Sequence, residues 1–345
     1  MADDDAIPAV PVWPDLLPWQ RTAAAAALAA RTSWPHALLI SGARGIGKRT
    51  LAQNFARSLL CESPRADAMA CGICASCRYV MAGQHPDLQL VEPFAIEDDG
   101  NVKALDAIPV DRIRALIDWA LLTGHRGRAK VAVIVPAETL NAAAANALLK
   151  TLEEPPPETF LLLVSHQPGR LPATLRSRCR RMTVPLPDPE LAAQWLAGQG
   201  IADPKTLLAQ AGGAPLLALA LADPAWQDER NVWLSALAKP KSLSAVALAT
   251  RIEAAPKDER KQRLAAAIDW LGAWTADLAR VAAGGLPVRN PEFAAALGAL
   301  AGAVAPIPLF RYHDAVLRQR ALLAHPLQPR LVAEALLIDY RSLFG

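Results

Sequence analysis

The sequence predicts an α/β domain followed by all-α domains, and three observations support this fold class. Four short, continuous apolar runs alternate with helical patterns in the first half of the chain. A glycine-rich loop of the phosphate-binding type follows the first of these runs. After residue 186 the strand signals stop and the composition turns to alanine and leucine. We therefore expect an α/β domain at 1–186, a small helical lid domain at 187–225 and a helical domain at 226–345.

The four apolar runs predict the strands of a parallel sheet. Runs of this length without polar alternation are typical of strands that helices cover on both faces. A fifth strand near residues 182–184 could close the sheet. The four runs occupy residues 36–40, 87–91, 131–135 and 159–164.

One helix is expected between the second and third strands. Ile113, Leu116, Ile117 and Ala120 fall at i, i+3, i+4 and i+7, the spacing of one helix face. Asp111 is a residue type that caps helix N-termini, so we expect the helix to begin there.

The remainder of the chain reads as helices. Residues 188–225 predict two or three short helices separated by glycines. From about residue 226 the helical pattern continues, and one apolar stripe predicts a core helix: Leu264, Ala267, Ile268, Leu271, Trp274 and Leu278.

Composition limits the class of protein. Apolar residues make up 52% of the 345 residues and charged residues 20%, which suits a globular protein with a large core. No apolar run approaches the ~18 residues of a membrane span, and the first residues lack the features of a secretion signal, so we expect a cytoplasmic protein. A net charge of +3 is too small to imply nucleic-acid binding by itself.

Residues 42–50 match a P-loop as far as its lysine. In such a loop the backbone N–H groups and the following helix N-terminus face phosphate oxygens, and the lysine reaches the β and γ phosphates. A strand precedes this loop and a helix, near residues 49–60, follows it. The candidate nucleotide-binding residues are Gly42, Gly45, Gly47, Lys48, Arg49 and Thr50.

Both magnesium ligands of an active P-loop are missing. Arg49 stands where a Ser or Thr hydroxyl should hold Mg²⁺, and a guanidinium has only donors. Thr50 comes one residue late, which turns its hydroxyl by about 100° on a helix. Val135 and Pro136 stand at the end of the third strand, where an acid is needed. Hydrolysis here is disfavoured, and the loop is either a structural turn or a metal-poor phosphate site, unless Glu138 acts as a displaced acid.

Four cysteines form a C-x9-C-x2-C-x2-C array: Cys61, Cys71, Cys74 and Cys77. Clustered thiols outside an oxidising compartment favour a metal over disulfides, and four thiolates suit Zn²⁺ in a closed structural site. An iron–sulfur cluster and ordinary thiols are the alternatives, but the fourth cysteine lies upstream and no Cys-Pro follows the array.

Residues 175–181 place four arginines within six residues after the fourth strand. By themselves they indicate a solvated basic edge or a phosphate-binding patch.

Several motifs together resemble the clamp-loader branch of the AAA+ ATPases, as found in bacterial DNA polymerase III. They are the loop at 42–50, the four-cysteine insertion, the string at 146–156 and the tripeptide Ser177-Arg178-Cys179. The resemblance covers about residues 13–225. It implies an AAA+ P-loop domain, a lid domain and a C-terminal collar domain that holds subunits together.

The resemblance implies a role for one arginine. In this family the arginine of Ser-Arg-Cys is a finger that reaches ATP bound by a neighbouring subunit, and the matching residue is Arg178. The implied partners are gamma or tau subunits and a delta subunit in a hetero-pentamer, which loads a sliding clamp onto primed DNA.

The chain departs from the ATP-hydrolysing gamma type at three places. These are Arg49, the Val135-Pro136 pair, where gamma has Asp-Glu, and Gly213-Ala214-Pro215-Leu216, where gamma has a sensor arginine. We therefore expect a non-hydrolysing member of the family. The rivals are an active gamma-type ATPase and a zinc-bearing nucleic-acid-binding module.

Overall fold

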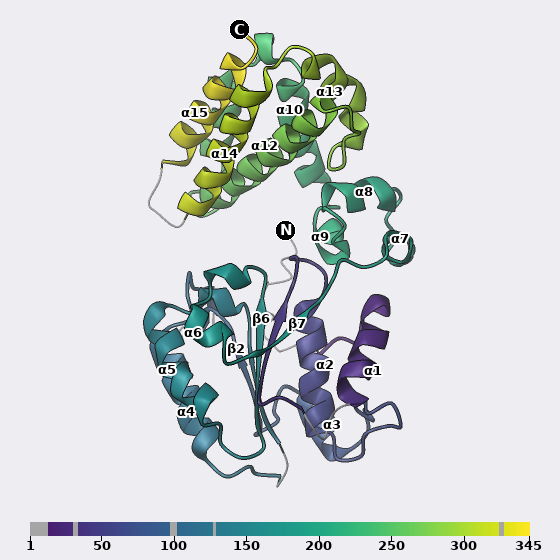
Figure 1. The fold of residues 1–345 in the computed structure, drawn as a ribbon, viewed down its shortest axis with the longest axis vertical. Coiled ribbons are helices and arrows are strands. Elements are labelled where there is room, and N and C mark those ends of the chain that lie inside the picture. Colours follow the sequence, from purple (N-terminus) through teal and green to yellow (C-terminus); the bar gives the residue numbers. More distant parts are fainter. Residues whose placement is uncertain (1–12, 30–33, 97–101, 127–128, 324–327) are drawn as a thin grey trace. The chain divides into compact units, whose positions relative to one another are not determined.

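The structure is a computed structural model that describes residues 13–29, 34–96, 102–126, 129–323 and 328–345 (Figure 1). The chain forms two compact units. The first comprises the residues up to Trp195 together with Ala214–Leu217. The second comprises Leu196–Gly213 and Ala218–Gly345.

The first unit is built on a five-stranded parallel sheet with the strand order β2-β5-β6-β1-β7. The four predicted strands and the fifth are confirmed, each within about two residues of its expected place. Their bounds are β1 Ala37–Ser41, β2 Leu88–Val91, β5 Lys130–Ile134, β6 Thr159–Ser165 and β7 Arg180–Thr183. The parallel α/β fold class of this part of the chain is therefore correct.

Helices cover both faces of this sheet, because successive residues of a strand point to opposite faces. Leu38 and Ile40 of β1 pack in one core with α1 (Arg21–Ala29) and α2 (Lys48–Leu60). Leu39 lies in the opposite core with α4 (Val110–Leu121) and α5 (Ala142–Glu153). The remaining short elements are η1 Pro18–Gln20, α3 Ala75–Met81, η3 Ala137–Thr139, η4 Pro168–Arg170 and α6 Ala173–Arg176.

One local prediction needs correction, and one short element was not predicted. The helix α4 begins at Val110 with Pro109 as its N-cap, so Asp111 is a first-turn residue and not the cap. Its carboxylate still favours the positive end of the helix dipole. A short antiparallel hairpin, β3 (Phe94–Ile96) and β4 (Val102–Ala104), was not expected, because three-residue strands carry too few residues for a periodicity.

The second unit is all helical among its described residues, as predicted. The apolar stripe expected at 264–278 lies in α12 and is buried throughout. Trp274 of that helix donates to the Tyr340 hydroxyl at 2.8 Å, and Tyr340 donates to the Leu237 carbonyl at 2.9 Å. The C-terminal helices are α10 Pro224–Leu237, α11 Ala245–Glu253, α12 Arg260–Ala282, α13 Ala294–Ala301, α14 Pro306–Leu322 and α15 Pro329–Ser342, with short turns η5 Pro240–Ser242 and η6 Pro291–Phe293.

The region of the expected lid contains three short helices: α7 Pro189–Gly198, α8 Pro204–Gln210 and α9 Pro215–Ala220. Helix α8 belongs to the same compact unit as the C-terminal helices, since Arg289 donates twice to the Gln210 carbonyl, at 3.0 and 2.6 Å. The boundaries of the compact units thus differ from 186/187 and 225/226. The division into AAA+, lid and collar domains stays a prediction.

Within the described ranges, no helix is both long enough and apolar enough to span a membrane.

Candidate functional site

The predicted P-loop connects β1 to α2. Its three glycines have positive φ values of 152° at Gly42, 77° at Gly45 and 84° at Gly47. Gly47 is the N-cap of α2, and Lys48 is the first residue of the helix. The strand, loop and helix thus have the connection that a phosphate-binding loop requires.

Contacts within the chain hold the lysine and a carbonyl group of the P-loop. The Lys48 side chain is buried, and its Nζ donates to the Ala43 carbonyl of the same loop. Leu216 N donates to the Gly45 carbonyl at 2.9 Å, and a Cβ at Gly45 would lie 2.6 Å from the Cβ of Leu217. The start of α9 therefore packs directly on the turn of the loop.

A second segment covers the other end of the loop. The Gln20 side chain donates to the Gly47 carbonyl at 2.6 Å, and a Cβ at Gly47 would lie 2.3 Å from Leu17 Cδ1. Trp19 Nε1 donates to the Ile46 carbonyl at 3.0 Å. Together with the contact of Leu216 N, these hydrogen bonds engage the carbonyls of three consecutive residues, Gly45, Ile46 and Gly47, where α2 begins.

Arg49 has a structural partner. Its Nη2 lies 3.0 Å from Oε2 of Glu92, which directly follows β2, and the two side chains are 12% and 5% exposed. Arg112 also contacts Glu92, since its Nη1 donates to the Glu92 backbone carbonyl at 3.0 Å. The residue that replaces the magnesium-binding hydroxyl thus forms a buried ion pair.

Replacing Arg49 by threonine should destabilise the first unit by about 3 kcal/mol without creating ATPase activity. Removing one partner of a buried ion pair leaves the other charge poorly compensated. Chemical denaturation measures the effect. Arg65→Thr is the matched control, because Arg65 pairs with Asp67 at the surface and should cost less than about 1 kcal/mol. Equal stability of Arg49→Thr and the parent protein would contradict a structural role for this pair.

The residues after β5 do not form an acidic magnesium site. Val135 is buried and Pro136 follows it, as the sequence indicates. Glu138 Oε1 accepts hydrogen bonds from His166 N at 2.9 Å and from Gln167 N at 3.2 Å, just beyond the end of β6. The acid that could have replaced the missing ligand therefore holds the backbone of a neighbouring strand end.

The four cysteines of the array come together at the end of α2 and the start of α3. Their sulfur atoms all lie within 4.8 Å of one another. The Cys61 and Cys74 sulfurs are 3.9 Å apart, and the Cys71 and Cys77 sulfurs 4.0 Å. Four thiolates at ~2.3 Å from a tetrahedral zinc ion would be about 3.8 Å apart. The donor set and its spacing therefore fit a metal ion.

Backbone N–H groups around the cluster favour thiolates. Cys71 N donates to the Cys61 sulfur at 3.3 Å, Cys74 N to that of Cys71 at 3.3 Å, and Cys77 N to that of Cys74 at 3.4 Å. Backbone hydrogen bonds from Ile73 and Cys74 lower the pKa of Cys71 to about 6, whereas burial raises the pKa of Cys77 to about 12. Without a cation, the buried sulfur of Cys77 would keep its proton.

Arg178 follows α6 and is partly exposed. Its Nε donates to Glu153 Oε1 at 2.7 Å, its Nη2 contacts the same oxygen, and its Nη1 donates to the Thr174 carbonyl at 2.8 Å. Glu153 is the last residue of α5. The structure therefore joins the string at 146–156 to the Ser-Arg-Cys tripeptide.

Glu153 is the site residue that the sequence analysis missed. It lies within the string at 146–156, but nothing in the sequence spacing connects it with Arg178, 25 positions later. The neighbouring Arg180 and Arg181 of β7 are exposed, and Cys179 is buried, which raises its pKa to about 11. Cys179 does not belong to the group of four close cysteines.

The chain is similar to known subunits of bacterial DNA polymerase III. Residues 23–188 match the family model described as DNA polymerase III, delta subunit. DNA polymerase III subunit delta' of Pseudomonas aeruginosa is 38% identical over 272 residues, which are 77% of this chain and 78% of that protein. The subunit delta' of Escherichia coli is 39% identical over 54% of each chain. The tau subunit of Escherichia coli is 40% identical over 144 residues, 42% of this chain and 20% of tau.

Proposed function

The chain belongs to the family of DNA polymerase III delta' subunits, and on this premise we propose that it is a clamp-loader subunit that does not hydrolyse ATP itself. In this proposal it serves the ATP site of a neighbouring gamma or tau subunit through Arg178. The complex as a whole would use ATP to load a sliding clamp onto primed DNA in the cytoplasm.

The contacts of the P-loop support the first part of the proposal, that the chain does not hydrolyse ATP itself. Lys48 donates to its own loop, the start of α9 packs on Gly45, and Arg49 pairs with Glu92. Catalysis of phosphoryl transfer depends on a metal ion that neutralises developing charge, and the two positions that should hold this ion contain Arg49 and Val135. The Lys48 contact and the two replaced metal ligands support a structural loop over a nucleotide-binding one.

The environment of Arg178 supports the second part, that the chain serves the ATP site of a neighbouring subunit. A guanidinium is always charged and offers a planar fork that fits phosphate oxygens. Its ion pair with Glu153 is partly exposed, with side chains 33% and 48% accessible, and pairs of this kind contribute at most about 1 kcal/mol. A γ-phosphate could therefore share the guanidinium with Glu153 at small cost.

The cysteine cluster is proposed as a structural zinc site. All four coordination positions of a tetrahedral ion would be taken by Cys61, Cys71, Cys74 and Cys77, which leaves no open position for a substrate. The ion would connect the end of α2 with the loop that precedes α3. Its contribution is to stability and not to catalysis.

The partners follow from the family. We propose a hetero-pentamer with gamma or tau subunits and a delta subunit, held together by the C-terminal helices as a collar domain. Contact with the clamp and with DNA would be indirect, through the complex.

The isolated chain provides the test against the rival function, a tau-like ATPase. That rival is favoured by the 40% identity with the tau subunit of Escherichia coli over 144 residues. Magnesium and ATP should produce no turnover above background with the purified chain, and the tau subunit serves as the positive control. Magnesium-dependent turnover by the chain would reject the proposal.

Glu153 should act through Arg178. In the reconstituted complex, Glu153→Gln is expected to slow ATP hydrolysis about threefold to tenfold, because a loosely held guanidinium spends less time in the productive orientation. A double-mutant cycle separates this role from a structural one. Glu153→Gln should have no further effect when Arg178 is already alanine. Additive losses would show that Glu153 acts independently of Arg178.

A further inference from the structure

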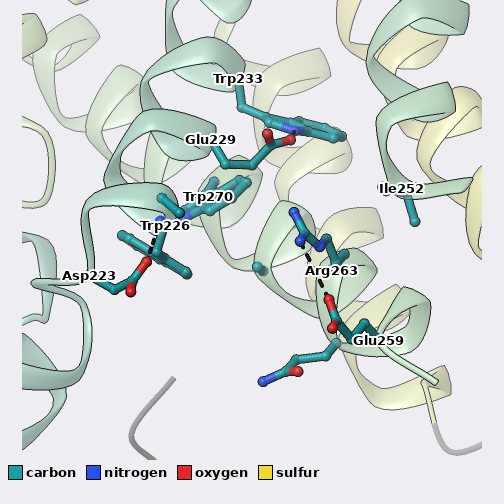
Figure 2. A pocket seen from close by; sticks show the side chains of 11 residues that line it. Asp223, Trp226, Glu229, Trp233, Ile252, Glu259, Arg263 and Trp270 are labelled. Carbon is teal, nitrogen blue, oxygen red and sulfur yellow. Dashed lines mark hydrogen bonds and ion pairs between the residues drawn. The ribbon is translucent and has the colours of Figure 1, made fainter. Parts of the chain in front are cut away.

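The second unit contains a cavity that the proposed function does not use. It has a volume of about 200 Å³ and lies between α10, α11 and the first half of α12 (Figure 2). Its walls include Trp226 and Trp233 of α10, Ile252 of α11, and Arg263 and Trp270 of α12. All of these residues belong to one compact unit.

Three indoles make the cavity strongly aromatic. The rings of Trp226 and Trp270 meet edge to face, with centroids 5.2 Å apart and an interplanar angle of 68°. The rings of Trp233 and Trp270 are 6.0 Å apart. Indole is the best aromatic partner for a cation, and its attraction grows when the site is shielded from water.

Carboxylates outnumber cations in the wall. Asp223, Glu229 and Glu259 line the cavity, whereas Arg263 is the one cationic residue in its lining. Glu229 is engaged, since it binds Arg251 and accepts from Trp233 Nε1, and these hydrogen bonds lower its pKa. Glu259 holds Arg263 only through an exposed contact of 3.4 Å. The aspartate and Glu259 therefore leave negative charge at the cavity.

Size and charge exclude other ligand classes. A cavity of about 200 Å³ is smaller than the roughly 300–1,000 Å³ of sites that enclose drug-sized molecules, so a nucleotide does not fit. The excess of carboxylates disfavours anions.

We propose that this cavity binds an arginine side chain presented by a partner polypeptide. The planar guanidinium would stack against an indole, and its N–H donors would face Asp223 and Glu259. A guanidinium suits such a site better than an ammonium because it is planar and less strongly hydrated.

The peptide acetyl-Ala-Arg-Ala-amide tests the proposal on the full-length chain. Indole N–H signals in ¹⁵N NMR spectra, assigned with single Trp→Phe variants, report binding at Trp226, Trp233 and Trp270. The arginine peptide should shift these three signals in a saturable manner. The same peptide with citrulline, which is neutral and nearly isosteric, should bind at least about tenfold more weakly.

Two variants locate the binding. Asp223→Asn removes the charge but keeps a good cap for α10, where the Asp223 side chain accepts from Trp226 N, and it should weaken arginine binding about fivefold. Asp203→Asn is the matched control, because Asp203 caps α8 in the same way and lies outside the cavity lining. Trp226→Leu should weaken binding about tenfold.

Several outcomes would overturn the proposal. They are the absence of saturable shifts with the arginine peptide, equal binding of the citrulline peptide, and equal effects of Asp223→Asn and Asp203→Asn. Preferential binding of acetyl-Ala-Glu-Ala-amide would also overturn it. None of these measurements depends on ATP or on other subunits, so the result is independent of the clamp-loader proposal.

Discussion

Replacing Arg178 by alanine should lower ATP hydrolysis at the neighbouring subunit's site by about 10³-fold, because arginine fingers supplied by a partner contribute roughly 10³–10⁵ in rate. The guanidinium would stabilise charge on the transferring phosphoryl group only after assembly. Single-turnover hydrolysis of ATP bound to the reconstituted complex measures this site separately from sites that do not need Arg178.

Two controls distinguish a finger from a general effect of charge. Arg180→Ala removes an exposed arginine two residues away and should leave the rate unchanged. Arg178→Lys keeps the charge but loses the fork, so it should remain strongly impaired. Gel filtration should show that the Arg178→Ala complex still assembles. A normal single-turnover rate in that complex would contradict the finger assignment.

Removing zinc should lower the first unfolding midpoint of the chain by about 10 °C or more. Metal binding at closed zinc sites is coupled to folding and is worth on the order of 10 kcal/mol in small zinc domains, and each kcal/mol shifts the midpoint of a domain of this size by about 2–4 °C. Elemental analysis should find about one zinc per chain, and thermal unfolding with and without a chelator measures the shift.

Cysteine variants connect this effect with the cluster. Cys71→Ser should lose zinc and unfold at the lower temperature even without a chelator. Cys179→Ser is the matched control, since Cys179 is buried in the opposite core from α2 and should keep zinc bound. Purified chain without zinc, or equal metal loss in both variants, would contradict a zinc site at this cluster.

The sequence predicted β1, β5 and β6 well because each is a continuous apolar run that is almost wholly buried. The edge strands β2 and β7 are partly exposed and carry a weaker pattern. The buried stripe of α12 was predictable for a similar reason, since its period is local. The start of α4 was predicted wrongly because aspartate is a preferred N-cap residue, which favoured Asp111. In the structure Pro109 is the last extended residue, and the helix begins at Val110. The β3–β4 hairpin was too short to have a pattern.

The candidate site was predictable only where its residues are adjacent in the chain. The loop at 42–50 and the cysteine array were found because their chemistry depends on spacing. The partners of Arg49 and Arg178 were not found, because Glu92 and Glu153 lie 43 and 25 residues away. Contacts at such separations depend on the strand order of the sheet, which no local pattern contains.

These two partners place the two arginines in different environments. Arg49 is tied to Glu92 in a buried pair, while Arg178 is held at the surface by an exchangeable contact. The first arrangement suits stability and the second suits a group that must reach a phosphate outside the chain. The proposed division of labour between the degenerate loop and the finger depends on this contrast.

The most direct test compares Lys48→Met and Arg178→Ala in otherwise identical reconstituted complexes. Methionine matches the unbranched stem of the buried Lys48 side chain but lacks the ammonium group that an active P-loop needs. If the chain serves only its neighbour's ATP, the Lys48→Met complex should hydrolyse ATP at the normal rate while the Arg178→Ala complex is strongly slowed. A slowed Lys48→Met complex together with a normal Arg178→Ala complex would show that this chain uses its own nucleotide site, and would contradict the account.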